Sequence, residues 1–160
     1  MSHGRAQRTL EQTSRQVGSL VWLDRQLFEI VGSWTQQAQD ASLAAYFAAT
    51  SHHFAWHASL LTDRLPRVGQ FARDVVCEPS PIHLRCVEDA RLATTATECL
   101  RHLVSQTFVE VQYLVGDLLA GSRSWTDGAL MHSLRVVSDD IARDWASGAQ
   151  LLVPRYVEDA

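Results

Sequence analysis

The chain has 160 residues, 46% hydrophobic and 20% charged, with a formal net charge of −4 at pH 7. A chain of this length can bury roughly two thirds of the surface that its unfolded form exposes, so residues 1–160 are expected to form one domain. The apolar content is too high for an intrinsically disordered chain. The acidic balance argues against nucleic acid or an anionic membrane as a partner.

The cysteines and the N-terminal residues indicate a compartment. Cys77, Cys86 and Cys99 form neither an even set nor a Cys-x-x-Cys pair, which argues against a disulfide framework or a thiolate zinc site. A reducing cytoplasm is therefore expected. Residues 1–10 lack the apolar run of a signal peptide, and no stretch approaches the roughly 18 to 20 apolar residues of a membrane span.

Long stretches without proline predict four helices, because helices usually end at or before a proline. The first is expected over residues 10–37, opened by a capping box of Thr9 and Gln12. The second is expected over residues 41–65, with Asp40 as its N-cap and a proline directly after its end.

The other two predicted helices lie in the second half of the chain. The third is expected over residues 92–120, with Gly121 as its stop. The fourth is opened by Thr126 or Asp127 and extends to Leu152, before the last proline.

The connections between these helices predict their topology. Short connections make each successive pair an antiparallel hairpin. Between the hairpins lies a long segment, residues 66–91, of which residues 82–91 can themselves be helical. A hairpin, a long crossover and a second hairpin are the connectivity of ferritin-like bundles. The predicted fold is all-α: an antiparallel four-helix bundle made of two helical hairpins joined by a long crossover.

Helical periodicity places two histidines on the inner face of the second helix. His57 lies at the centre of the apolar face, His53 lies one turn before it, and His52 points away. Residues at i and i+4 are neighbours on a helix surface, so both imidazoles can reach one metal ion. The alternative is a pair of core histidines bonded to carboxylates, and such pairing would raise the pKa of His57.

Acidic side chains on the other helices are expected to approach these histidines. Asp24 lies in the middle of the inner face of the first helix, at a height between the two imidazoles. In the fourth helix Asp144 falls on the inward stripe with Asp140 on its shoulder, and Glu110 lies at the edge of the inner face of the third. Charged groups in a helical core are costly unless they are paired, neutralised or bound to a metal.

Two arrangements would compensate the buried charges of this cluster. One is an iron or manganese centre, because carboxylate oxygens with imidazole suit these metals and bundle cores build such sites from facing helices. The other is a metal-free network of Asp24, His53, His57 and Asp144, strengthened by Arg64 near the end of the second helix.

Two sequence motifs, together with the predicted connectivity, resemble a divergent ferritin-like protein of the actinobacterial kind. The motifs are SHHFAWHASLLTDRLP over residues 51–66 and SDDIARDW over residues 138–145. The resemblance covers nearly the whole chain in architecture, and these two helices in motif.

Carried over position by position, the resemblance implies a set of metal ligands. His53 matches the family's histidine in the second helix, Asp140 matches the carboxylate in the fourth, and Glu110 is the best match for the third. For the first helix Asp24 is favoured by its inward orientation and Glu29 only by its residue type.

The sequence departs from the family pattern in both motif helices. Ferritin-like di-iron proteins carry Glu-x-x-His on two helices. Here the residue three before His53 is Thr50, and the residue three after Asp140 is Arg143. These departures favour a mononuclear or altered centre, built from Asp24 and the two histidines with one further carboxylate of the third or fourth helix, over a standard di-iron centre.

Two functions are expected on these grounds. The resemblance implies oxidase or oxygenase chemistry at a non-haem iron or manganese, with Tyr46 or Tyr113 as a redox or hydrogen-bonding neighbour and an unidentified small-molecule substrate. The alternative is a metal-free structural or interaction module, dimeric through the outer face of the first helix around Trp22, or through that of the fourth. The chain has no phosphate-binding loop, dinucleotide fingerprint or nucleophile elbow.

Three other residues of the third helix are expected to have structural roles. Cys99 is expected to be a small buried residue. Glu98 and His102 are expected to form a surface pair one turn apart.

Overall fold

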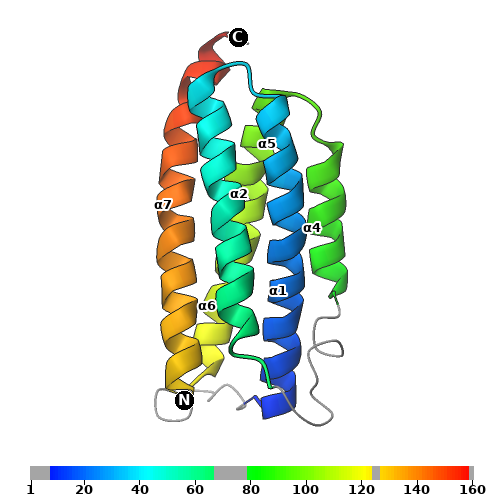
Figure 1. Ribbon diagram of the computed structural model, residues 1–160, viewed down its shortest axis with the longest axis vertical. Helices are drawn as coiled ribbons and strands as arrows, with labels where there is room; N and C mark the ends of the chain where they lie inside the picture. The colour runs from blue at the N-terminus through cyan, green and yellow to red at the C-terminus, as the bar shows by residue number, and fades with distance from the viewer. Residues whose placement is uncertain (1–7, 67–78, 124–126, 159–160) are drawn as a thin grey trace, which may run out of the picture.

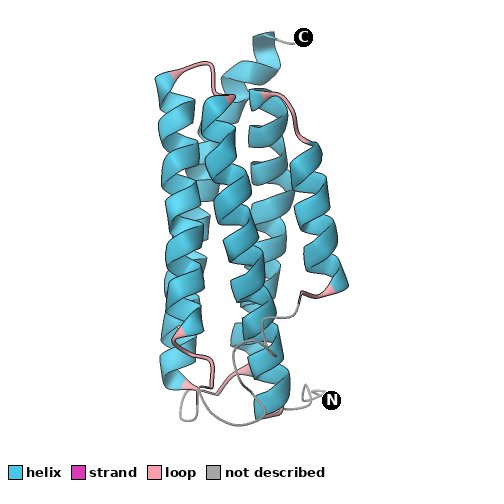
Figure 2. Ribbon diagram, turned by 45° about the vertical axis from the view of Figure 1, so that its right-hand side comes forward, coloured by secondary structure: helices cyan, strands magenta, loops and turns pink. Residues whose placement is uncertain are grey.

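The computed structural model describes residues 8–66, 79–123 and 127–158, with side chains as far as residue 153. All regular secondary structure in these ranges is helical (Figure 2). The all-α prediction is therefore confirmed. The α-helices are α1 (Leu10–Ser33), α2 (Ala41–Thr62), α4 (Pro81–Leu92), α5 (Ala96–His102), α6 (Phe108–Gly121) and α7 (Gly128–Glu158).

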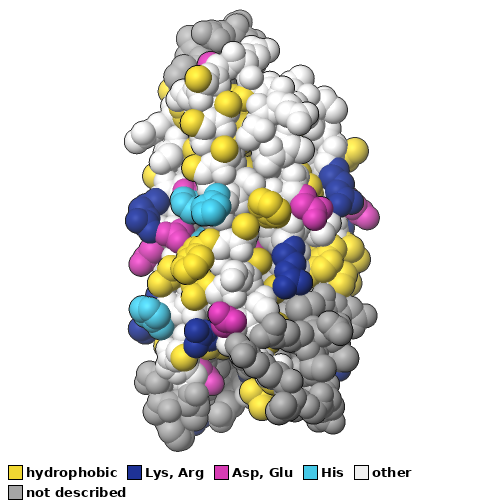
Figure 3. Space-filling model, viewed as in Figure 1, with side chains coloured by type: hydrophobic (Ala, Val, Ile, Leu, Met, Phe, Trp, Pro, Cys, Tyr) yellow, Lys and Arg dark blue, Asp and Glu magenta, His cyan; other side chains and the backbone are white. Residues whose placement is uncertain are grey.

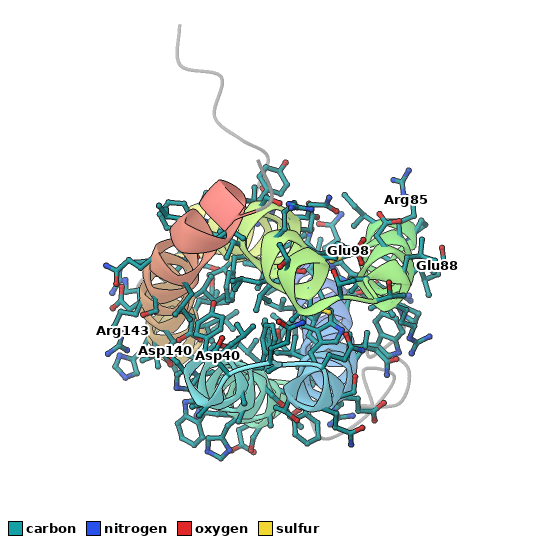
Figure 4. All side chains as sticks on the ribbon, turned by 90° about the horizontal axis from the view of Figure 1, so that it is seen from above. Asp40, Arg85, Glu88, Glu98, Asp140 and Arg143 are labelled. Atoms are coloured by element: carbon teal, nitrogen blue, oxygen red, sulfur yellow. The ribbon has the colours of Figure 1, made fainter. Side chains whose placement is uncertain are left out.

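The long helices lie side by side (Figure 1). α1 and α2 form an antiparallel hairpin, α7 lies on the far side of α2, and α5 and α6 continue one another behind them. Seen from above, these elements surround an interior filled with side chains, and α4 lies outside against α1 (Figure 4). Each large apolar side chain that is fully buried contributes about 1.5–3 kcal/mol. The largest of them are Trp34, Phe47, Phe54, Phe108, Leu20, Leu23, Leu27, Leu43, Leu61, Leu100, Leu103 and Leu134.

The first hairpin begins as predicted, but both of its helices end early, α1 before residue 37 and α2 at Thr62 instead of residue 65. The Thr9 hydroxyl accepts a hydrogen bond from the Gln12 amide at 3.2 Å, and the Gln12 side chain accepts one from the Thr9 amide at 2.9 Å. α1 ends at Ser33, and a 3-10 turn over Trp34–Gln36 leads toward α2. The Asp40 side chain caps α2. These local bonds fix the antiparallel approach of the two helices.

The third predicted helix starts in the wrong place. Leu92 ends α4 instead of opening the third helix, and α5 begins at Ala96. The reason is a second capping box, in which Thr95 and Glu98 bond each other's backbone amides and so begin a new helix. α4 itself confirms the expectation that residues 82–91 are helical.

A π-helical segment, Leu103–Thr107, joins α5 to α6. In such a segment the backbone bonds span five residues instead of four, and π-turns often lie at functional sites. The Trp145 ring N–H donates to the Val104 carbonyl within it at 3.0 Å. This bond ties α7 to the distorted turn.

α7 is longer than predicted, because it continues through Pro154 to Glu158 instead of ending at Leu152. A proline near the end of a helix removes one backbone hydrogen bond while the neighbouring turns keep theirs. Asp127 directly precedes the helix, as one of the two proposed openings requires, and Thr126 lies outside the described residues.

Candidate functional site

Two histidine–aspartate pairs join α2 to α7. His53 Nδ1 lies 2.7 Å from Asp144 Oδ2, and His57 Nε2 lies 3.2 Å from Asp140 Oδ2. The two imidazole rings are nearly parallel, with centroids 6.4 Å apart. Both helices contribute residues at i and i+4, so the pairs lie one turn apart. We call these four side chains the His–Asp face. Histidine, acidic and arginine side chains gather over α2 and α7 at mid-height in Figure 3.

A close approach between α2 and α7 supports this arrangement. The Tyr46 hydroxyl donates to the main-chain carbonyl of Asp144 at 2.9 Å. The approach depends on Gly148, since a Cβ there would lie 2.9 Å from Tyr46 Cζ and 2.8 Å from Val104 Cγ2. Tyr46 therefore fixes the backbone turn that carries Asp144.

The His–Asp face passes from the interior to the surface. The side chain of His57 is 1% exposed and that of His53 is 39% exposed, while Asp140 and Asp144 are 14% and 13% exposed. Arg143, on the outside of α7, also forms an ion pair with Asp140 (Figure 4). A small ligand can therefore reach this face from the His53 side.

Burial is the largest influence on the pKa values of His57, Asp144 and Tyr46. It lowers the pKa of His57, although Asp140 acts in the opposite direction. The expectation that pairing with an acid raises the pKa of His57 is therefore wrong, because desolvation of the imidazolium outweighs the pairing. Burial raises the pKa of Asp144, partly offset by His53, and it also raises the pKa of Tyr46. At neutral pH His57 is thus a neutral ring, and its Nδ1 lies in the interior with no hydrogen-bond partner in the part of the chain that the structure describes.

Asp24 faces the interior, as its position in α1 predicts. It is 0% exposed, neither carboxylate oxygen has a hydrogen-bond partner among the described residues, and burial raises its pKa well above the usual value. The contacts of Phe28 with Ser51 and of Arg25 with Thr62 place this turn of α1 beside the part of α2 that holds His57. No hydrogen bond joins Asp24 to the His–Asp face, so its role as a ligand stays a prediction.

The third-helix carboxylate lies elsewhere. Glu110 shares a cavity with Cys86 and His102 on the α4 side. Burial raises the pKa of the Cys86 thiol, and the charge of Glu110 adds to this effect. The structure therefore does not bring Glu110 to the His–Asp face. Glu29, the other candidate of α1, is exposed.

The other residues proposed to surround the site have different positions. Tyr46 contacts the turn of Asp144, whereas Tyr113 is 64% exposed on α6. Arg64 is exposed and lines a surface cavity with residues of α1 and α7. Trp22 is half-buried and packs against the core.

Trp22 lies on the face of α1 that α4 covers. On this face the Gln26 side chain accepts a hydrogen bond from Arg91 at 2.9 Å, and His83 of α4 lies against the Ser19 backbone. The predicted contact surface around Trp22 is therefore used within the chain, by a helix whose position the helical pattern of α1 does not reveal.

His102 is buried, contrary to the prediction of a surface pair with Glu98. His102 is 8% exposed and its Nδ1 lies 3.0 Å from the Thr107 hydroxyl, whereas Glu98 caps α5 instead of pairing with it. Glu98 accepts instead from the Thr94 and Thr95 amides, and His102 faces residues of α4, which the periodicity of the third helix alone does not reveal. Cys99 is fully buried, as expected.

The described side chains do not form a ready-made metal site. Within residues 8–66, 79–123 and 127–153, no three or more His, Cys, Asp or Glu side chains are arranged to hold a metal ion. The donors of the His–Asp face are instead engaged with one another in pairs. Metal binding there requires these hydrogen bonds to be exchanged for metal–ligand bonds.

Comparisons with known proteins add no relative: no family model matches the chain, and no curated protein or solved structure is significantly similar to it. Among the helices described, none combines the length and the apolarity needed to cross a bilayer.

Proposed function

We propose that the protein is a ferritin-like four-helix-bundle metalloprotein that binds one iron or manganese ion at the His–Asp face. In this proposal α1, α2, the combined α5–α6 element and α7 are the four bundle helices, and α4 belongs to the crossover. The antiparallel α1–α2 hairpin and the position of α4 outside α1 support it. Ferritin-like bundles have one long crossover and place their metal ligands on facing helices.

The observation that carries the proposal is the pairing of His53 and His57 with two aspartates one turn apart on the adjacent helix. Two imidazoles and a carboxylate are the donor set of non-haem Fe(II) sites. The distance of 3.2 Å between His57 Nε2 and Asp140 Oδ2 matches the separation of about 3.0–3.4 Å between neighbouring ligands on a metal with bonds near 2.0–2.2 Å.

The residues around the face would assist binding. Tyr46 fixes the turn of Asp144, and the exposed side of His53 gives an ion a path from solvent. Arg143 competes with a cation for Asp140, so metal binding would displace its ion pair. A bound iron or manganese ion would supply redox chemistry with oxygen or peroxide, which an oxidase or oxygenase requires.

Anaerobic loading with Fe(II) or Mn(II), followed by desalting and metal analysis, tests the proposal. The wild type should retain about one metal ion per chain, and the double variant His53→Ala/His57→Ala should retain none. His52→Ala is the matched control, because His52 is exposed on the same helix. A wild type that retains no metal, or a double variant that retains as much as the control, would contradict the proposal.

A metal-free structural or interaction module is the second candidate function. The observation in its favour is that both His–Asp pairs are already satisfied by direct hydrogen bonds. A dimer would then use the exposed apolar surface of α6 and α7, where Val109, Tyr113 and Trp145 are 57%, 64% and 47% exposed. Light scattering should show a dimer that is insensitive to chelator and weakened by Tyr113→Asp, whereas a monomer would contradict this candidate.

A further inference from the structure

A narrow face attaches α4 to the rest of the described structure. Three of its side chains are buried at the spacing i, i+4 and i+7, which places them on one stripe of the helix: His83, Val87 and Ala90. Outside this stripe Leu84 and Leu92 are 41% and 75% exposed. α4 lies outside the other helices, against α1 (Figure 4). Few apolar side chains therefore hold it in place.

The first residue of this stripe is a histidine, although a helix that packs on its neighbours usually carries apolar residues at such positions. His83 is 3% exposed. Both of its ring nitrogens are inaccessible to solvent, and neither forms a hydrogen bond within residues 8–66, 79–123 and 127–153, although the Ser19 backbone lies against the ring. Water therefore does not reach these nitrogens while α4 is docked.

Among the described residues, the charged groups beside His83 do not stabilise its protonated form. Arg15 of α1 and Asp117 of α6 line the cavity of about 270 Å³ that His83 borders. Asp117 forms an ion pair with Arg8, and Arg15 carries the same sign of charge as an imidazolium. Burial lowers the pKa of His83, and the Ser19 backbone offsets this effect only in part. The ring is therefore neutral at neutral pH.

The titratable groups that face α4 from the π-helical segment and α6 lie on a different side of the helix. His102 and Glu110 border a second cavity together with Cys86 and Asp89 of α4. Burial raises the pKa of Cys86 to about 11, so its sulfur is a neutral thiol. Burial lowers the pKa of His102, partly offset by Asp89. The shift of the His83 pKa therefore arises on the side of α4 that faces α1.

Protonation of His83 and docking of α4 oppose each other. In an undocked α4 the ring would be hydrated and would titrate near the ordinary pKa of about 6.5, whereas burial lowers this pKa in the docked helix. Above about pH 6.5 the ring is neutral in both states, and docking is fully favoured. As pH falls below this value the undocked state binds a proton first, so the docking equilibrium weakens by up to about tenfold per pH unit.

We propose that α4 is a pH-sensitive element of the fold, which mild acidification releases from α1 through protonation of His83. The short apolar stripe makes release of this helix possible without unfolding of the bundle, because local openings use the elements with the fewest buried apolar contacts. The buried histidine within the stripe makes the release depend on pH. Release would uncover the side of α1 that carries Trp22. The inference does not depend on metal binding at the His–Asp face.

Amide hydrogen exchange of the full chain between about pH 7.5 and pH 5, with chelator present, tests this inference. Each exchange rate is divided by the intrinsic rate at the same pH, so that the result reports the opening equilibrium. Below about pH 6.5 the opening constant of α4 should rise by up to about tenfold per pH unit, and more steeply than that of α2, which serves as the internal reference. Protection of α4 that does not depend on pH, or that falls only in parallel with that of α2, would overturn the proposal.

Variants of the histidine assign the response to a single residue. His83→Leu and His83→Gln both remove the titrating ring, the first with an apolar and the second with a polar side chain, and in both α4 should lose the steeper fall in protection. His52→Gln is the matched control, because His52 is exposed on α2, and it should keep the behaviour of the wild type. A fall of wild-type size in both His83 variants would overturn the proposal. The comparison of α4 with α2 in the wild type does not depend on the folding of any variant.

Discussion

Replacing the buried carboxyl group of α1 should stabilise the protein, and increasingly so at higher pH. Asp24 is 0% exposed and neither of its oxygens has a partner among residues 8–66, 79–123 and 127–153, so its ionised form is strongly disfavoured and its pKa is raised. Asp24→Asn keeps the shape and the polarity of the protonated acid but has no proton to lose. The variant isolates the free-energy cost of ionising this group.

The sign of the effect follows from proton linkage. The unfolded chain releases the Asp24 proton near pH 4, whereas the folded chain holds it to higher pH. Between these two values folding takes up a proton, so the free energy of unfolding of the wild type falls as pH rises, by up to about 1.4 kcal/mol per pH unit. The variant lacks this loss, and its advantage is absent below the unfolded pKa.

Urea unfolding followed by circular dichroism at about pH 4, 6 and 8, with chelator present, measures the difference. Asp24→Asn should equal the wild type near pH 4 and exceed it at pH 8. The exposed Asp139→Asn is the control and should show no such trend. A difference that does not depend on pH, or a variant that is less stable at pH 8, would refute the account of Asp24 as an unpartnered buried acid.

Three further outcomes are expected. Gly148→Ala should lower the free energy of unfolding by about 1–3 kcal/mol in thermal unfolding, because its Cβ would crowd Tyr46. Adding Tyr46→Phe to this variant should recover part of the loss. Equal melting temperatures of Gly148→Ala and the wild type would contradict the close approach. Burial lowers the pKa of His57, so the metal-free protein should lose stability as pH falls below about 6.5. In urea titrations His57→Gln should reduce that loss. An unchanged dependence of the free energy of unfolding on pH would contradict this expectation. Thr95→Ala should cost about 1 kcal/mol through its lost cap, more than the control Thr97→Ala.

The local signals in the sequence predict much of the helical structure. The capping residues Thr9 and Asp40 act as their residue types indicate, and α1, α2 and α4 follow from them and from the prolines. The apolar periodicity continues across Thr95 and does not predict the break before α5, although the capping box of Thr95 and Glu98 is present in the sequence. The hydrogen bonds of this capping box begin a new helix, where periodicity alone predicts one continuous helix.

Helical periodicity also predicts the inward orientation of Asp24 and His57, because both lie on regular α-helical turns. It does not reveal the burial of His102 or the cavity that Glu110 shares with it, which depend on the π-turn near Thr107 and on α4 packing outside the bundle. Neither feature leaves a periodic signal in the sequence. The opposition of His53 to Asp144 likewise depends on how α2 and α7 are aligned, which the close approach at Gly148 determines.

The most direct test of the proposed metal site observes the imidazole nitrogens themselves. Addition of one equivalent of Zn(II), as a diamagnetic stand-in for iron or manganese, to protein with 15N-labelled histidine should shift the ring nitrogens of His53 and His57 and leave exposed His52 unchanged. The coupling of the metal to both rings at a single equivalent would show that the His–Asp face binds as one unit. Unshifted resonances of His53 and His57, or shifts shared equally with His52, would contradict the proposed metal site.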